Sequence, residues 1–345
     1  MQIDTLSEFL TGAGTDFRLY DLGRRLQPLV RADFAAIEAG QRPYPWPLQQ
    51  HAWLAVAYWQ RAGLSQPYIW FLKIPLDERG LLSNGAVKHF LAALVEQLGQ
   101  EPYAPLSEQQ QQQLAGTPFT FQPPQDKLAA FHARLSRDLG RPPSAYYPAL
   151  LDYLDDPARS DWQQLGLQGL ADLAARLGDD EALAAQLRRS LWRLPEPVRL
   201  ALLAQCEHHP LPAGLVEDLL GAISGELERA NPDEARIGLL LRATAGSAPS
   251  PGRSNKIASL LALAPGQTLM LTLAARLWQE LTEESLLLAY LAQLAERHPA
   301  LFNGLFAELV SIPALRPLIL ANLHNPQLPA SLRQALGGLF PAARG

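Results

Sequence analysis

Apolar residues are arranged in two different ways along the chain, and the change lies near residue 100. Before it, the segments 51–60 (HAWLAVAYWQ) and 68–75 (YIWFLKIP) are almost continuously apolar and rich in aromatic side chains. Such short runs are typical of buried β-strands, with a helix as the alternative for the first run. Gly63 lies between them, so the two strands are expected to form a hairpin.

Shorter patterns surround this hairpin. Residues 17–20 predict a strand, residues 21–25 a bend, and the three prolines in 43–47 an extended loop. Three further segments have helical spacing and end at a glycine: 3–11, 31–39 and 85–98. Residues 1–100 are therefore expected to form a small, aromatic-rich domain that mixes helices and strands.

Leu/Ala-rich amphipathic segments, most of them separated by Pro or Gly, dominate the chain after residue 125. They predict about thirteen helices, at 126–139, 145–155, 160–177, 180–193, 196–208, 213–229, 233–243, 254–263, 268–281, 284–297, 299–310, 315–323 and 330–339. Helical pairs repeating every ~30–40 residues resemble HEAT-like repeats, although no clean repeated motif accompanies the spacing. A single irregular helical bundle is the alternative.

Two segments are predicted to divide the chain. Residues 101–125 contain five prolines and the run Gln109–Gln113, a composition typical of a linker, and 119–121 are expected to add an edge strand. Residues 245–254 (AGSAPSPGRS) predict an exposed loop that could split the helical part. The expected fold class is α+β: domain 1–100, linker 101–125 and an all-α, HEAT-like array over 126–345.

Charge and composition narrow the function classes. The 345 residues carry a net charge of −5, and the first 100 hold 9 basic and 9 acidic side chains, so the acidic excess lies in the helical part. This balance disfavours nucleic acid as a partner, because non-specific binding draws on Lys and Arg neutralising phosphates. The amino terminus does not look like a signal peptide, and no apolar stretch reaches the ~18 residues of a membrane span. A soluble, cytoplasmic protein that does not bind a membrane is expected.

Charged residues gather where two predicted strands end. A strand end followed by a helix amino terminus attracts anions, since free N–H groups and the helix dipole point there. If the two turns meet, they form one candidate site for a small anionic ligand: Asp21, Arg24, Arg25, Lys73, Asp77, Glu78 and Arg79. The alternative interpretation is a network of ion pairs that fixes two turns.

Aromatic residues are densest between residues 44 and 71, where four of the seven tryptophans lie. They could form a stacking platform for bases, a groove for a partner, or simply the core of a small sheet. Tyr44 and Trp46 belong to the proline-rich loop. An exposed Trp46 there would indicate a protein interface, because Trp is enriched at binding hot spots.

No motif for catalysis or for a cofactor is visible. Cys206 is the only cysteine and lies close to His208 and His209, but the ligand spacing of a zinc site is missing. The two histidines are more simply explained by the dipole at the end of a helix. Glycine-rich phosphate loops, nucleophile elbows and metalloprotease motifs are also absent, so no catalytic residue, cofactor or metal is predicted.

Three segments carry a family resemblance: DLGRRL at 21–26, PYPWPLQ at 43–49 and WFLKIPLDERGLL at 70–82. With them, the chain resembles a gamma-proteobacterial protein family of unknown function, most clearly over residues 1–100. The resemblance implies a bacterial cytoplasmic origin and transfers no activity or site.

Three functions remain open at this point. The first is a non-catalytic scaffold or adaptor for a protein partner, which an apolar groove on the helices would favour. The second is a ligand-binding or catalytic amino-terminal domain, which a closed polar pocket with Asp21, Asp77 and Arg79 would favour. The third is nucleic-acid binding, which exposed tryptophans beside Arg24, Arg25 and Lys73 would favour.

Overall fold

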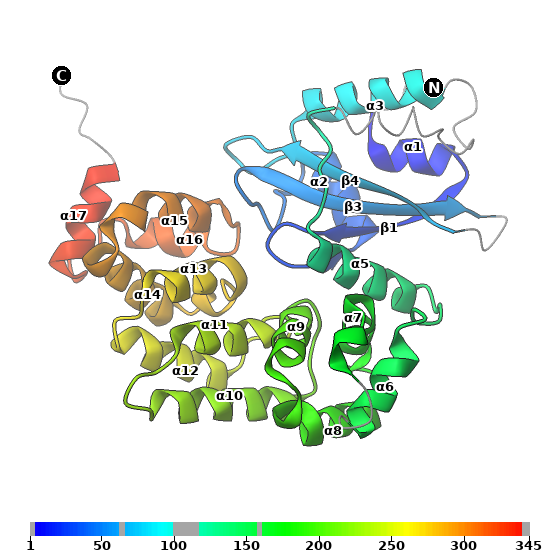
Figure 1. Ribbon diagram of the computed structural model, residues 1–345. Helices are drawn as coiled ribbons and strands as arrows, with labels where there is room; N and C mark the ends of the chain where they lie inside the picture. Colours follow the sequence, from blue (N-terminus) through cyan, green and yellow to red (C-terminus); the bar gives the residue numbers. More distant parts are fainter. Residues whose placement is uncertain (1–3, 62–65, 99–116, 157–160, 340–345) are drawn as a thin grey trace, which may run out of the picture. The chain divides into compact units, whose positions relative to one another are not determined.

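The fold is described from a computed structural model, which describes residues 4–61, 66–98, 117–156 and 161–339 (Figure 1). The chain forms two compact units. The first comprises Met1–Pro123 with Val310–Arg316, and the second comprises Pro124–Leu309 with Pro317–Gly345. Most of the predicted linker lies outside the described residues. The class is α+β, with one small sheet in the first unit and helices throughout the second.

A four-stranded antiparallel sheet organises the first unit. Its order is β2-β1-β3-β4, and the strands are β1 (Thr15–Asp21), β2 (Gln27–Leu29), β3 (His51–Gln60) and β4 (Tyr68–Pro75). Asp21 lies opposite Leu54, and His51 lies opposite Pro75. The carboxyl ends of β1 and β4 therefore meet at the same end of the sheet.

Three helices accompany the sheet in the described part of residues 1–123: α1 (Leu6–Gly12), α2 (Arg31–Glu38) and α3 (Asn84–Leu98). A capping box of Thr5 and Glu8 starts α1 by satisfying free amide groups of its first turn. Helix α1 packs against β1 and α3, and α3 packs against β4. The core between them is filled by buried aromatic and aliphatic side chains such as Phe34, Leu54 and Phe90.

The predicted edge strand at 119–121 is reduced to a single bridge, in which Thr120 pairs with Leu72 of β4. The Lys73 amide donates to the Phe119 carbonyl at 2.7 Å, and the Phe121 amide donates to the Phe71 carbonyl at 3.2 Å. The end of the Pro-rich stretch thus covers the edge of the sheet, which would otherwise expose unpaired backbone groups.

Each of the thirteen predicted segments after residue 125 overlaps one α-helix of the described structure. These helices are α5 (Gln125–Asp138), α6 (Tyr147–Asp155), α7 (Leu167–Arg176), α8 (Glu181–Ser190), α9 (Glu196–Cys206), α10 (Ala213–Leu227), α11 (Glu234–Ala243), α12 (Pro251–Ala262), α13 (Gln267–Arg276), α14 (Glu284–Arg297), α15 (Pro299–Ser311), α16 (Arg316–Asn322) and α17 (Ala330–Leu339). No helix among the described residues is long and apolar enough to cross a membrane.

Alternate helices of the second unit pack side by side in two layers. Helices α5, α7, α9, α11 and α13 follow one another in one layer, and α6, α8, α10, α12 and α14 follow one another in the other (Figure 1). Contacts between α6 and α7 and between α10 and α11 join the layers. Each of these helices thus packs against its neighbours in the same layer.

An arginine recurs at the end of the helices in the first of these layers. Arg176 in α7, Arg242 in α11 and Arg276 in α13 lie in the last turn of their helices. The pentapeptide LAARL even occurs twice, at 173–177 and 273–277. Arg242 and Arg276 both pair with Glu207, at 2.7 and 3.3 Å, so one carboxylate ties two neighbouring helices to the end of α9.

The predicted exposed loop at 245–254 is wrong in its second half. Helix α12 begins at Pro251, because the Ser250 hydroxyl caps it and a proline at the first helical position loses no hydrogen bond. Arg253 is buried and donates to Glu280 Oε1 at 2.6 Å and to the backbone carbonyls of Ser247 and Ala248 at 3.0 and 2.9 Å. The array is not divided here, since α10 packs on α12 and α11 on α13 across this segment.

Candidate functional site

The charged residues at the carboxyl end of β1 and directly after it are buried and not exposed to a ligand. Asp21, Arg24 and Arg25 have exposed fractions of 0, 1 and 3%. The Tyr44 hydroxyl donates to Asp21 Oδ1 at 2.6 Å, and Arg24 Nε donates to the Pro47 carbonyl at 2.8 Å. Burial, together with the negative charge of Asp21, raises the pKa of the Tyr44 phenol well above its usual value. These contacts attach the proline-rich loop to the end of β1.

Tyr44 also connects the two predicted turns through its backbone. Its amide donates to the Gly80 carbonyl at 2.8 Å, while its hydroxyl reaches Asp21. Gly80 adopts a φ of +81°, a conformation that favours glycine. Because Tyr44 is completely buried, it offers no surface to a partner, and the predicted interface role of its side chain is wrong.

The second turn is exposed and is held by Asp77. Its Oδ1 accepts the backbone amides of Arg79 and Leu81, both at 2.9 Å, and its Oδ2 pairs with the Arg79 guanidinium at 3.1 Å. The Leu81 amide, followed by the Arg79 contacts, lowers the pKa of the Asp77 carboxyl. Glu78 is exposed beside them. Asp77 thus serves primarily to shape the turn.

An open cavity of about 520 Å³ adjoins this turn, and its walls include Asp77, Arg79, Ser83 and Asn84. Asp21, Arg24 and Arg25 do not line it. The two turns therefore meet at one end of the sheet, but their charges do not converge on one pocket.

The remaining candidates of the first unit take part in packing. The Lys73 ammonium lies 4.5 Å from the centre of the Trp53 ring, whose Nε1–H donates to the Leu48 carbonyl at 3.0 Å. Trp46 and Trp70 are partly buried against the core, and Trp46 meets the Tyr44 ring edge to face at 6.4 Å. These tryptophans mainly extend the core of the sheet.

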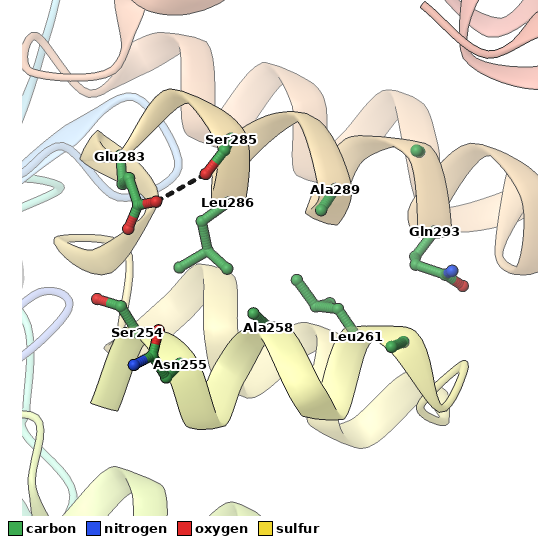
Figure 2. Close-up of a pocket in the computed structure, with 11 residues that line it drawn as sticks. Ser254, Asn255, Ala258, Leu261, Glu283, Ser285, Leu286, Ala289 and Gln293 are labelled. Carbon is green, nitrogen blue, oxygen red and sulfur yellow. Dashed lines mark hydrogen bonds between the residues drawn. The ribbon is translucent and has the colours of Figure 1, made fainter. Parts of the chain in front are cut away.

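The second unit contains a different candidate, which we call the α12–α14 groove. It is a cavity of about 270 Å³ between these two helices. Figure 2 shows Ala258 and Leu261 of α12 facing Leu286 and Ala289 of α14. The groove is bordered by four alanines, which leave room between the helices: Ala258, Ala262, Ala289 and Ala292.

Polar groups lie at the two ends of the groove. At one end, the Ser285 hydroxyl donates to Glu283 Oε1 at 2.7 Å, and the Ser254 hydroxyl donates to Glu280 Oε2 (Figure 2). At the other end, Gln293 Oε1 is buried and has no hydrogen-bond partner among the described residues. None of the eleven lining residues is basic.

The groove was missed in the sequence, although a signal exists. Ser254, Ala258, Leu261 and Ala262 are spaced to share one face of a helix, and Leu286, Ala289 and Gln293 share a face of another. Small residues on one helical face indicate close packing as readily as an open surface. Only the packing of α12 beside α14 makes them a groove.

The segment at the end of α9 is buried, not exposed at a helix end. Cys206, Glu207, His208 and His209 are each at most 4% exposed. Burial raises the pKa of the Cys206 thiol to about 12, so the thiol stays neutral and unreactive. Among the described residues, no group of three histidine, cysteine or acidic side chains could hold a metal ion.

Comparison with known proteins adds a family and no activity. No significant match is found among curated proteins or among solved structures. A family model described as "Protein of unknown function (DUF3549)" matches residues 1–340. The match covers both compact units, including the charged turns of the first and the α12–α14 groove of the second. The chain therefore belongs to the DUF3549 family of proteins of unknown function.

Proposed function

We propose that this protein is a non-catalytic scaffold or adaptor of the cytoplasm, and that its HEAT-like helical array binds a protein partner. The observation that carries the proposal is the α12–α14 groove, an open and largely apolar surface between two well-packed helices. Grooves between the helices of a stacked array are natural docking places, because the array holds both walls rigidly.

The size of the groove favours a protein segment as its occupant. At about 270 Å³ it is smaller than the ~300–1,000 Å³ of typical small-molecule sites, but it accommodates one or two side chains.

The charged groups of the first unit support this choice indirectly. Asp21 and Arg24 fix the proline-rich loop, and Asp77 and Arg79 neutralise each other at the turn. The hydrogen bonds of these four residues account for them as structural groups, so no catalytic role is needed to explain them. The buried core of the sheet is filled by side chains.

A small anionic ligand in the first unit is the second candidate. The polar cavity of about 520 Å³, where Arg79 lies near Ser83 and Asn84 at the start of α3, favours it. A ligand would have to compete with Asp77 for the Arg79 guanidinium. Nucleic-acid binding ranks third, because Trp46 and Trp70 pack against the core.

The scaffold is tested by tagged purification of the full chain from its native cells with nuclease treatment. Ala289→Trp fills the groove, and Ala182→Trp places the same bulk on an exposed position of α8, outside it. We expect a stoichiometric protein partner with the native chain and the α8 variant, reduced at least tenfold with the groove variant. A partner retained equally by all three chains, or none at all, would overturn the proposal.

A further inference from the structure

We propose that the occupant of the α12–α14 groove is an extended peptide segment of a partner protein that carries a lysine or arginine next to a small apolar side chain. This inference rests on the proposed function and specifies the chemistry of the partner. It draws on three properties of the groove: its charge, its unmatched hydrogen-bond acceptor and its length.

The one charged residue among the eleven that line the groove is acidic. Glu283 is exposed at one end, and its other neighbours in the lining, Ser285, Ser254 and Asn255, are neutral. Two cations of α12 lie next to this end in the sequence: Arg253 is buried and pairs with Glu280 at 2.6 Å, and Lys256 donates to the Ser224 hydroxyl on α10 at 2.6 Å. A basic side chain of the partner would meet Glu283 without competition from the walls, whereas an acidic one would be repelled.

The opposite end of the groove lacks a hydrogen-bond donor. Gln293 Oε1 is buried without a partner among the described residues, and a buried acceptor left unsatisfied is unfavourable. A backbone N–H is the donor that every extended peptide supplies. Oε1 has no accessible surface in the free protein, so the half-buried Gln293 side chain has to turn toward the groove before the N–H of an occupant can reach it. An occupant that brings such a donor would remove this defect, so the acceptor favours a polypeptide over an apolar surface.

The spacing of the two ends sets the length of the segment. Glu283 and Gln293 are ten positions apart along α14, which corresponds to about 15 Å at 1.5 Å per helical residue. An extended chain spans this distance with about four to five residues. The middle of the segment then lies over Leu286 and Leu261 between the alanine borders, where only small or medium apolar side chains fit.

The probe is a displayed library of random heptapeptides, selected on the full chain with Ala289→Trp as the counter-selection. Selected peptides are then synthesised, and their Kd values are measured by fluorescence anisotropy. The variants are Glu283→Lys, Gln293→Leu and the matched control Glu217→Lys, which lies exposed on α10 outside the groove. Ala258→Trp fills the groove from the facing helix. A loss of binding in both Ala258→Trp and Ala289→Trp is then not due to a folding defect of Ala289→Trp alone.

We expect the selected peptides to contain a lysine or arginine beside a small apolar residue. Their affinity should fall at least tenfold in Glu283→Lys and severalfold in Gln293→Leu, and stay within twofold in Glu217→Lys. Peptides whose basic residue is exchanged for glutamate should bind the Glu283→Lys chain better than the native one.

Three results would overturn the inference. The charge requirement would be wrong if peptides that bind in the groove lacked a basic residue. It would also be wrong if Glu283→Lys and Glu217→Lys lowered the affinity equally. If no selected peptide loses its binding in both Ala258→Trp and Ala289→Trp, the occupant of the groove is not a peptide. The proposed function is judged separately: if the native partner is lost with Ala289→Trp but kept with Glu283→Lys, the scaffold stands and this inference fails.

Discussion

His209 illustrates, at the scale of one residue, how burial decides the chemistry of a side chain. It is 1% exposed, and neither ring nitrogen has a hydrogen-bond partner among the described residues. Burial, and then the nearby positive charges of His208, Arg134, Arg137 and Arg176, lower the pKa of the ring well below its usual value. In the folded protein the imidazole is therefore neutral at neutral pH.

This lowered pKa predicts a loss of stability in mild acid. The unfolded chain takes up a proton near the ordinary histidine pKa of about 6.5, whereas the folded chain does not. The free energy of unfolding should therefore fall as the pH drops below about 6.5, by up to ~1.4 kcal/mol per pH unit from this group. Urea unfolding at pH 7.5 and pH 5.5 measures the effect.

The variant His209→Phe removes the titrating ring and should weaken this pH dependence. Its control is His324→Phe, because His324 is exposed and the substitution there leaves the buried ring in place. If the stability of His209→Phe fell between the two pH values as steeply as that of the native chain, the account of His209 would be wrong.

At the scale of elements, the backbone of the same histidine lies against the segment that connects α11 with α12. A Cβ atom on Gly246 would lie 2.2 Å from the His209 carbonyl oxygen and 2.6 Å from its amide nitrogen. Backbone atoms cannot move aside as a flexible side chain can. The segment 245–250 can therefore approach the end of α9 only because residue 246 has no side chain.

Two glycine-to-alanine substitutions test this close approach. Gly246→Ala should lower the free energy of unfolding by about 2 kcal/mol or more, since the backbone of one segment has to shift. Gly221→Ala, on α10 where an added Cβ meets nothing within 4 Å, should raise it by about 0.5–1 kcal/mol through helix propensity. Chemical denaturation measures the free energy of unfolding of both variants. If Gly246→Ala left it unchanged, the packing argument would be wrong.

Elements were predicted well where the local pattern dominates. The strands at 51–60 and 68–75 have the predicted bounds, and every predicted helix after residue 125 overlaps an α-helix of the structure. The three-residue strand β2 was missed because its pairing with β1 depends on contacts that its own sequence does not encode. The start of α12 was missed because its Ser, Pro and Gly residues are typical of loops as well as of helix caps.

The repeated arginine shows why the array looked irregular in the sequence. Arg176, Arg242 and Arg276 lie in the last turn of their helices, but the corresponding residue near the end of α9 is Gln205, whose side chain donates to the Asp126 carbonyl. The connections between helices also differ in length. The pairing of Arg242 and Arg276 with a shared Glu207 becomes visible only when neighbouring helices are stacked.

At the scale of the whole molecule, the candidate sites were only partly predictable. The sequence placed the two charged turns at strand ends, and the sheet register brings these ends together. Whether a charge is buried depends on the loop that covers it, so the burial of Asp21 and Arg24 beneath the proline-rich loop was not foreseen. The groove required the relative placement of two helices, which no local pattern contains.

We expect a partner protein to occupy the α12–α14 groove in the cell. The most direct measurement places a photo-crosslinking amino acid at position 289 in the groove, and in a second chain at exposed position 182 on α8. Both chains are irradiated in their native cells, and adducts are identified by mass spectrometry. We predict one dominant protein adduct from position 289 that position 182 does not form. The same adducts from both positions, or none from position 289, would contradict the claim.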